Sequence, residues 1–296
     1  MDIRNIGVVG AGTMGIGVSH AFAEAGFTVA LVDIDERALE RAKTEIERNV
    51  RFYPLLRKEA PARPASDVLQ NISFSTGLAA LGNAQFVVEN ATENWGVKQG
   101  IFPGLDEVCP EECVLAVNTS AIPITKVAAL TGRPDRVIGT HFMNPAPLKP
   151  LVEVIRGYHT SADTVRLTQD ILAGIGKESI VVEDSPGFVT NRVLMLTINE
   201  AIFLLHEGVS SVRDIDRLFK KCFGHTMGPL ETADLIGLDT ILYSLEVLLE
   251  NFDDPKYRPC VLLKQLVDAG LHGRKNGKGF YTYDERGQIR EEADRG

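Results

Sequence analysis

The sequence predicts an α/β fold in which a doubly wound, mainly parallel sheet is followed by an all-helical part. Up to about residue 185, short β-branched runs alternate with helical stretches, a pattern typical of sheets built from βαβ units. Beyond that point the β-branched runs stop and the patterns become helical. A chain of 296 residues is also long for a single core, so two domains are expected, covering residues 1–184 and 185–296.

Composition excludes several classes of protein. The chain has 31 basic and 40 acidic residues, a net charge of −9, whereas nucleic-acid-binding domains are usually basic. With 44% hydrophobic and 24% charged residues it resembles a globular chain rather than a disordered one. No apolar run reaches the roughly 20 residues of a membrane span, and the N-terminus runs directly into a strand-like segment without a secretory leader. We therefore expect a cytoplasmic protein with no membrane or nucleic-acid partner.

The cysteines do not indicate a disulfide scaffold or a metal site. There are four, namely Cys109, Cys113, Cys222 and Cys260, which is too few for a disulfide framework in a chain of this length. None of them forms the C-x-x-C pair found in many zinc sites. Reduced thiols and no bound metal are expected.

The first strand, expected at residues 4–9, leads directly into Gly10-Ala11-Gly12-Thr13-Met14-Gly15 and then a helix. In this context Gly10 allows a tight turn, Gly12 lets the backbone approach a pyrophosphate, and Gly15 lets the helix pack closely. The amino end of the helix then faces the anionic charge. We expect these six positions to form a dinucleotide-binding loop of the Rossmann type.

The second strand, expected at residues 28–32, ends at Asp33, which lies 23 residues after Gly10. This is near the spacing of about 20 expected for the acid that binds an adenine ribose. Its carboxylate would accept hydrogen bonds from a 2′-hydroxyl and repel a 2′-phosphate, and no arginine follows directly. NAD is therefore predicted in preference to NADP.

The remaining elements complete a Rossmann-type doubly wound sheet followed by an all-helical C-terminal domain. Further strands are expected at residues 71–75, 86–89, 113–117, 136–142, 151–155 and 179–182. Helices are expected at about 188–207, 212–222, 228–249 and 258–270, and a strand-like run at 280–283 follows a glycine-rich loop.

A histidine and a glutamate fall on two strands joined by a proline-rich turn. His141 lies near the end of one strand and Glu153 in the next. Such a hairpin could place the carboxylate beside the imidazole, where it fixes the tautomer and stabilises the imidazolium. From the residues alone, an unrelated pair remains the more common alternative.

Residues 41–63 form a basic segment in an acidic chain, with seven basic and three acidic side chains. A solvated helix face is the simplest interpretation. A docking surface for a phosphorylated substrate or an acidic partner is the alternative.

Ordered motifs along essentially the whole chain resemble those of the 3-hydroxyacyl-CoA dehydrogenases, including the 3-hydroxybutyryl-CoA type. Besides the glycine loop, they are Glu93-Asn94 with Lys98, Asn118-Thr119-Ser120, His141-Phe142-Met143-Asn144-Pro145, Leu151-Val152-Glu153-Val154-Ile155, Asp184-Ser185-Pro186-Gly187-Phe188 with Asn191-Arg192, Met227-Gly228-Pro229 and Gly277-Lys278-Gly279-Phe280-Tyr281.

The resemblance implies an NAD-dependent oxidation of a 3-hydroxyacyl thioester. His141 would be the general base and Glu153 its orienting partner, while Ser120 and Asn191 would hydrogen-bond to the substrate oxygens. Histidine suits this task because its proton exchange falls near neutral pH.

The resemblance also implies a set of cofactor contacts. Glu93, Lys98, Ser120, Asn144 and Lys275 would lie along the nicotinamide ribose and the phosphates, with Asp33 at the adenine end. The helical domain would form a homodimer, a role for which the apolar run at residues 241–249 is suited.

Two departures from the family concern the loop after the fourth strand and the carrier end of the substrate. Asn90 stands where many relatives have alanine, and the basic segment does not reproduce the usual serine and lysine that contact CoA. In their neighbourhood stand Asn49, Arg57 and Lys58, which we assign to substrate binding. Some relatives act on acyl groups tethered to an acyl carrier protein, as in hydroxymalonyl or methoxymalonyl extender-unit pathways, so a glyceryl group on such a carrier is the alternative substrate.

Two other functions are weighed. The β-hydroxyacid dehydrogenase type needs a catalytic lysine followed four residues later by asparagine in the interdomain helix, and residues 190–194 contain no lysine. A non-catalytic NAD-binding protein is the second alternative, against which the complete set of reacting residues argues.

Overall fold

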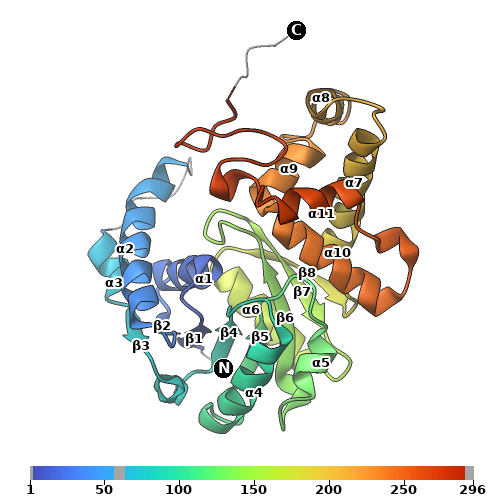
Figure 1. Ribbon diagram of the computed structural model, residues 1–296. Coiled ribbons are helices and arrows are strands. Elements are labelled where there is room, and N and C mark those ends of the chain that lie inside the picture. The colour runs from blue at the N-terminus through green and yellow to red at the C-terminus, as the bar shows by residue number, and fades with distance from the viewer. Residues whose placement is uncertain (1–2, 57–63, 291–296) are drawn as a thin grey trace. The chain divides into compact units, whose positions relative to one another are not determined.

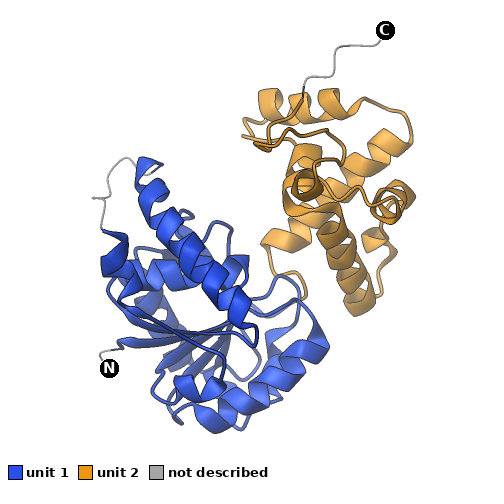
Figure 2. Cartoon of the chain, turned by 60° about the vertical axis from the view of Figure 1, so that its left-hand side comes forward, with its two compact units in different colours: residues 1–185 blue, residues 186–296 orange. Residues whose placement is uncertain are grey.

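The computed structural model describes residues 3–56 and 64–290. The chain divides into two compact units, Met1–Ser185 and Pro186–Gly296, which are coloured separately in Figure 2. The predicted substrate contacts Arg57 and Lys58 lie outside the described residues. Within the described ranges, no helix combines the length and the apolar character that crossing a bilayer requires.

The first unit is built on an eight-stranded sheet with the order β3-β2-β1-β4-β5-β6-β7-β8 (Figure 1). Its strands are β1 (Asn5–Val9), β2 (Thr28–Val32), β3 (Ile72–Ser75), β4 (Phe86–Glu89), β5 (Val114–Val117), β6 (Val137–Phe142), β7 (Leu151–Arg156) and β8 (Glu178–Glu183). The first six run parallel in the order typical of dinucleotide-binding sheets, whereas β7 pairs antiparallel with β6. The predicted doubly wound sheet is therefore confirmed.

Helices cover both faces of this sheet. They are α1 (Thr13–Glu24), α2 (Glu36–Phe52), α3 (Ala65–Leu69), α4 (Trp95–Val108), α5 (Ile124–Ala128) and α6 (Ala162–Gly174), with short 3-10 turns at Tyr53–Leu55, Leu78–Leu81 and Pro134–Arg136. Buried side chains of α1, α2 and α6 share one core with alternate residues of the strands. Helices α4 and α5 lie on the other face, where Gly139 of β6 leaves room for Ile124 (Figure 1).

The second unit is helical. It contains α7 (Thr190–His206), α8 (Val212–Cys222), α9 (Pro229–Ile236), α10 (Leu238–Phe252) and α11 (Val261–Asp268), with 3-10 turns at Pro255–Tyr257 and Arg274–Asn276. The single helix predicted at 228–249 is wrong, because Gly237 has a φ of +107° and separates α9 from α10. The strand expected at 280–283 is also wrong: these residues take part only in isolated bridges.

The apolar run at residues 241–249 belongs to the core of the second unit. Ile241, Leu245 and Leu248 are fully buried within that unit's own cluster. Their spacing puts them on one face of α10, and that face packs against the neighbouring helices. These three side chains are therefore not available to a dimer surface, and the role of the run in dimerisation stays a prediction.

Candidate active site

The glycine loop closes the turn between β1 and α1. Gly10 has a φ of +95°, and a Cβ at Gly15 would lie 1.7 Å from the Gly10 carbonyl oxygen, so neither position tolerates a side chain. Beside Gly12, by contrast, the space within 4 Å is open. Gly12 caps α1 without a side-chain hydrogen bond, which leaves amide groups of the first turn available to an anion.

Asp33 holds the loop from the end of β2. Its Oδ2 accepts a hydrogen bond of 2.7 Å from the Ala11 amide, and its Oδ1 accepts one of 2.9 Å from the Asp35 amide. Each carboxylate oxygen keeps a further lone pair for a ribose hydroxyl. A cavity of about 820 Å³ lies here, lined by residues 10–14, Asp33 and Ile34 among others. Loop, acid and cavity together fit a dinucleotide.

Glu93 organises the loop that carries Ser120. One carboxylate oxygen, Oε1, accepts hydrogen bonds from the Ser120 amide at 3.0 Å, the Ala121 amide at 3.1 Å and the Thr119 hydroxyl at 2.5 Å. The loops after β4 and β5 are thereby joined at the carboxyl edge of the sheet, where ligands bind in such folds.

Lys98 forms a buried ion pair. Its Nζ donates to Glu89 Oε2 at 2.6 Å, and both side chains are fully buried. Burial raises the pKa of the Glu89 carboxyl, while the Lys98 ammonium acts in the lowering direction. The Lys98 ammonium is therefore paired with the carboxylate of Glu89, the last residue of β4.

The departure at Asn90 has a structural counterpart that sequence reasoning missed. The side-chain Nδ2 of Asn118 donates to Asn90 Oδ1 at 2.6 Å, and Asn118 Oδ1 accepts a hydrogen bond of 3.2 Å from the backbone amide of Phe142. The ends of β4, β5 and β6 are linked in this way. Only the unusual residue at position 90 signalled the contact.

His141, Glu153 and Ser120 lie together. The β6–β7 register pairs His141 with Glu153, and Nδ1 lies 3.1 Å from Glu153 Oε2. An ionised carboxylate only accepts hydrogen bonds, so we assign the proton to Nδ1, which leaves Nε2 as the acceptor. Nε2 lies 3.2 Å from the Ser120 hydroxyl. His141 and Glu153 are 5% and 2% exposed, so the imidazole and the carboxylate are shielded from water.

Asp184 is a second residue that sequence reasoning left without a role. It follows β8, and its carboxylate accepts hydrogen bonds from the amides of Ile124 and Thr125 at 3.1 and 2.7 Å. These are the first residues of α5, which follows the Ser120 loop directly. Asp184 thus fixes the far end of the segment that begins at Ser120.

Four other predicted site residues have no described contact with the groups above. Asn144 is exposed after β6, and Asn49 is half-buried on α2. Asn191 lies in the first turn of α7 in the second unit. Lys275, also in that unit, donates to both carboxylate oxygens of Asp239 at 2.5 Å. The roles of these four residues stay predictions.

Fold and site together define a dinucleotide-dependent dehydrogenase. Residues 5–185 match the family described as 3-hydroxyacyl-CoA dehydrogenase, NAD binding domain, and residues 187–283 match 3-hydroxyacyl-CoA dehydrogenase, C-terminal domain. The chain belongs to the 3-hydroxyacyl-CoA dehydrogenase family, and it is an NAD-dependent oxidoreductase.

Relatives of similar length support this assignment. The chain is 44% identical, over 97% of its length and 99% of the relative, to a probable 3-hydroxybutyryl-CoA dehydrogenase of Bacillus subtilis. It is 44% identical, over 95% of its length and 96% of the relative, to a 3-hydroxybutyryl-CoA dehydrogenase of Bradyrhizobium diazoefficiens. The crystal structure of (S)-3-hydroxybutyryl-CoA dehydrogenase from Ralstonia eutropha matches with a TM-score of 0.90 and 43% identity, covering 96% of this chain and all of that one.

Proposed function

We propose that the chain interconverts a short 3-hydroxyacyl-CoA, with 3-hydroxybutyryl-CoA as the first candidate, and its 3-oxoacyl form. The observation that carries the proposal is the line of hydrogen bonds from Glu153 through His141 to Ser120, beside a loop that fits NAD. Two relatives that cover nearly the whole chain are 3-hydroxybutyryl-CoA dehydrogenases by name, one of them a probable one, which supports the same acyl group and carrier.

The residues divide the work as follows. Oxidation of a 3-hydroxyl removes a proton from oxygen and a hydride from carbon, and the residues of the nucleotide loop would hold NAD, which when bound would supply the hydride acceptor. His141 Nε2 takes the hydroxyl proton as general base, and Glu153 stabilises the resulting imidazolium through Nδ1. Ser120 holds the substrate oxygen, because its hydroxyl already lies within hydrogen-bond distance of Nε2. We assign to Asn191 the carbonyl oxygen of the thioester, where a donor also stabilises developing negative charge.

The cofactor contacts fall into direct and supporting ones. We assign the pyrophosphate to residues 10–15, the adenine ribose to Asp33, and the nicotinamide half to Glu93, Ser120, Asn144 and Lys275. For Lys98 we infer a supporting role, since its ammonium is buried against Glu89.

Replacing His141 by Gln and Glu153 by Gln tests the mechanism. Turnover of 3-hydroxybutyryl-CoA, followed by NADH absorbance, should fall by about 10²–10⁴-fold in each variant, the usual contribution of a positioned base. NADH affinity, measured by fluorescence titration, should stay within about threefold, because the nucleotide loop is unchanged. Full turnover in both variants would rule the mechanism out.

The carrier is tested by offering one acyl group on two carriers. Comparison of 3-hydroxybutyryl-CoA with the same group on an acyl carrier protein should give the higher kcat/KM for CoA. A strong preference for the protein-bound group would favour the alternative substrate class. Arg57→Ala and Lys58→Ala should raise KM without changing NADH affinity if the basic segment binds the carrier, and an unchanged KM would return it to a solvated helix face.

We also propose that the second unit forms a homodimer. Support comes from apolar side chains that the unit leaves exposed, among them Val193 at 62% and Phe223 at 69%. Val193 also lines an apolar cavity of about 410 Å³ with Phe219 and Met227. The variant Val193→Asp should shift the protein from dimer to monomer in light scattering, whereas a native monomer would refute the proposal.

A further inference from the structure

A lysine that the proposed reaction leaves unused is buried at the edge of the sheet where β6 ends and β7 begins. Lys177 directly precedes β8 and is 8% exposed. Its Nζ donates hydrogen bonds to the Pro147 carbonyl at 2.9 Å and to the Lys149 carbonyl at 2.7 Å. Both carbonyls belong to residues 143–150, the β6–β7 turn. Because burying an ammonium is costly unless it is hydrogen-bonded, the lysine and the turn hold each other in place.

The β6–β7 turn joins the strands that carry the proposed base and its partner. His141 is the last residue but one of β6, and Glu153 is the third residue of β7. Within the turn, Asn144 is exposed, and it is the residue that we assign to the nicotinamide half of the cofactor. The carbonyls that accept from Lys177 follow Asn144 by three and five residues. The ammonium therefore holds the backbone that presents Asn144.

The backbone of Lys177 is fixed by contacts of its own. The Lys177 amide donates to the Leu172 carbonyl of α6 at 2.9 Å, and Gly176, with a φ of +69°, turns the chain out of that helix. The Glu178 amide donates to the Pro150 carbonyl at 2.8 Å, where β8 begins to pair with β7. The side chain of Lys177 thus reaches the turn from a backbone that α6 and the sheet hold in place.

The β6–β7 turn also packs against the helix that follows the nucleotide loop. A Cβ added at Gly17 of α1 would lie 3.2 Å from the Ala146 Cβ and 3.3 Å from the Pro147 Cδ. Ala146 is 2% exposed and belongs to the core of the first unit. Contacts with α1 and with Lys177 together therefore set the position of the turn relative to the glycine loop.

We propose that Lys177 is a positioning residue for the cofactor: its ammonium holds the β6–β7 turn in the conformation in which Asn144 meets the nicotinamide half of NAD. The inference rests on the proposed contact of Asn144. A turn that is ordered before binding loses less conformational freedom when the cofactor binds. Lys177 acts on the nicotinamide half alone, since the pyrophosphate and the adenine ribose are assigned to residues 10–15 and Asp33, outside the turn.

The test compares two ligands on the full-length chain by calorimetry. ADP carries the adenine, its ribose and the pyrophosphate, but it has no nicotinamide ribose. Lys177→Met should raise the dissociation constant of NADH by about three- to tenfold, as expected for loss of one hydrogen bond, and should change that of ADP by less than about twofold. A merely structural loss would weaken both ligands equally, because it lowers the fraction of folded protein.

A double-mutant cycle shows whether Lys177 acts through Asn144. Asn144→Ala should raise the dissociation constant of NADH at least as much as Lys177→Met does. The double variant Asn144→Ala/Lys177→Met should bind NADH no more weakly than Asn144→Ala, because the lysine then has no contact left to position. Circular dichroism shows that each variant is folded. If Lys177→Met is not, Lys177→Gln, which keeps a neutral donor, takes its place with the same expected selectivity for NADH over ADP.

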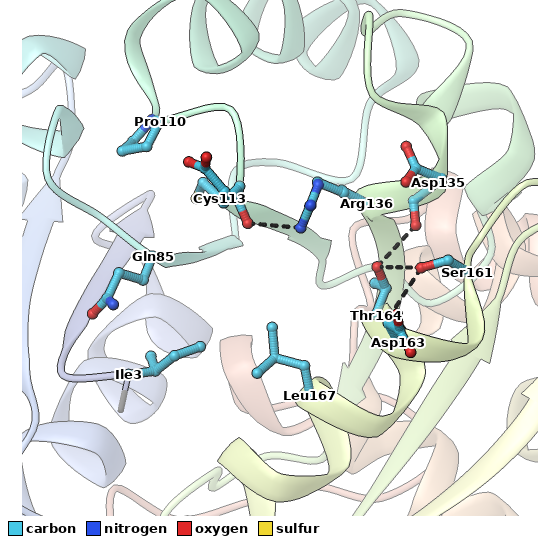
Figure 3. Close-up of a pocket in the computed structure, with 11 residues that line it drawn as sticks. Ile3, Gln85, Pro110, Cys113, Asp135, Arg136, Ser161, Asp163, Thr164 and Leu167 are labelled. Atoms are coloured by element: carbon cyan, nitrogen blue, oxygen red, sulfur yellow. Dashed lines mark hydrogen bonds between the residues drawn. The ribbon is translucent and has the colours of Figure 1, made fainter. Parts of the chain in front are cut away.

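The matched control is Arg136→Met, at the opposite end of β6. Arg136 is also a cation that donates to a backbone carbonyl, with Nη1 3.0 Å from the Glu112 oxygen. Figure 3 shows this arginine in the wall of a cavity of about 570 Å³, together with Pro110 and Leu167. Loss of this hydrogen bond should change the dissociation constants of NADH and ADP by less than about twofold.

Three results would overturn the inference. They are an equal loss of affinity for NADH and ADP in the Lys177 variant, independent losses that multiply in the double variant, and unchanged NADH affinity in Asn144→Ala. The last result would also remove the assigned contact of Asn144, but it would leave the roles of His141 and Glu153 standing. Turnover of 3-hydroxybutyryl-CoA by the native chain tests the proposed reaction separately, since the binding comparison needs no turnover.

Discussion

The buried ion pair between Lys98 and Glu89 yields a quantitative prediction for Lys98→Met. At the Nζ–Oε2 distance of 2.6 Å, an effective dielectric constant of about 20 gives an attraction of about 6 kcal/mol. The cost of burying both charges offsets part of this attraction. Removing only one partner leaves a buried, unpaired charge and typically costs about 3–5 kcal/mol, a large fraction of the stability of a domain.

The effect should depend on pH. Burial already raises the pKa of Glu89 in the folded protein, and loss of the ammonium raises it further. A carboxyl whose pKa is higher in the folded state stabilises the fold at low pH and loses that contribution as the pH rises. The destabilisation by Lys98→Met should therefore shrink as the pH falls from about 8 to about 5.5, with a slope of at most about 1.4 kcal/mol per pH unit for one proton.

Urea unfolding followed by the fluorescence of Trp95 measures the effect. Trp95 is the only tryptophan and the first residue of α4, so it reports on the element that carries Lys98. The double variant Glu89→Gln/Lys98→Met should recover most of the lost free energy of unfolding, and the control Lys43→Met, on the exposed face of α2, should change it by less than about 0.5 kcal/mol. A loss below about 1 kcal/mol for Lys98→Met, or one independent of pH, would refute the reasoning.

The double variant also separates the two roles considered for Lys98. If Lys98 only supports the fold, any loss of NADH affinity in Lys98→Met should be reversed in the double variant together with the loss of stability. If the ammonium contacts the cofactor, the NADH dissociation constant should stay raised although stability is restored.

Three further predictions concern the nucleotide loop and the second unit. Gly15→Ala places a Cβ 1.7 Å from the Gly10 carbonyl oxygen, so NADH affinity in a fluorescence titration should fall by more than about 100-fold. The control Gly77→Ala adds its Cβ in open space and should leave NADH affinity unchanged. Asp33→Asn should weaken NADH binding by about tenfold, as expected for loss of one charge-assisted hydrogen bond, and should raise the relative affinity for NADPH; an unchanged preference would contradict the assigned ribose contact. Burial raises the pKa of Asp234, so this carboxyl contributes less stability to the folded protein as the pH rises above about 4. The variant Asp234→Asn should therefore show a smaller fall of the melting temperature with rising pH. An equally steep fall in the variant would show that other groups cause it.

Local sequence patterns predicted much of the fold. The β-branched runs and the intervening helical patterns located the eight strands to within a residue or two, because hydrophobic periodicity and strand length depend on nearby residues. The error at residues 228–249 arose where one glycine turns the chain between two helices of similar apolar character. Periodicity does not reveal such a break, since the buried face continues on both sides of Gly237.

The contacts of the site were less accessible to sequence reasoning. The glycine loop and Asp33 were recognised because their spacing along the chain follows from a single turn and one strand. The hydrogen bonds from Asn90 through Asn118 to the Phe142 amide join three strands. The hydrogen bond between Asp184 and the Ile124 amide, at the start of α5, joins residues that are 60 positions apart. A local sequence pattern cannot predict contacts between residues so far apart in the chain.

The sequence by itself indicated the sheet and the nucleotide, because these rest on short motifs with fixed chemistry, and its resemblance to a family indicated the type of reaction. Only the tertiary structure decided how the groups are paired. It placed Lys98 against Glu89, set Nδ1 of His141 beside the Glu153 carboxylate and buried the apolar face of α10. The physical reason is that protonation, burial and hydrogen bonding depend on distances of a few ångströms between elements, which the order of residues along one chain does not specify.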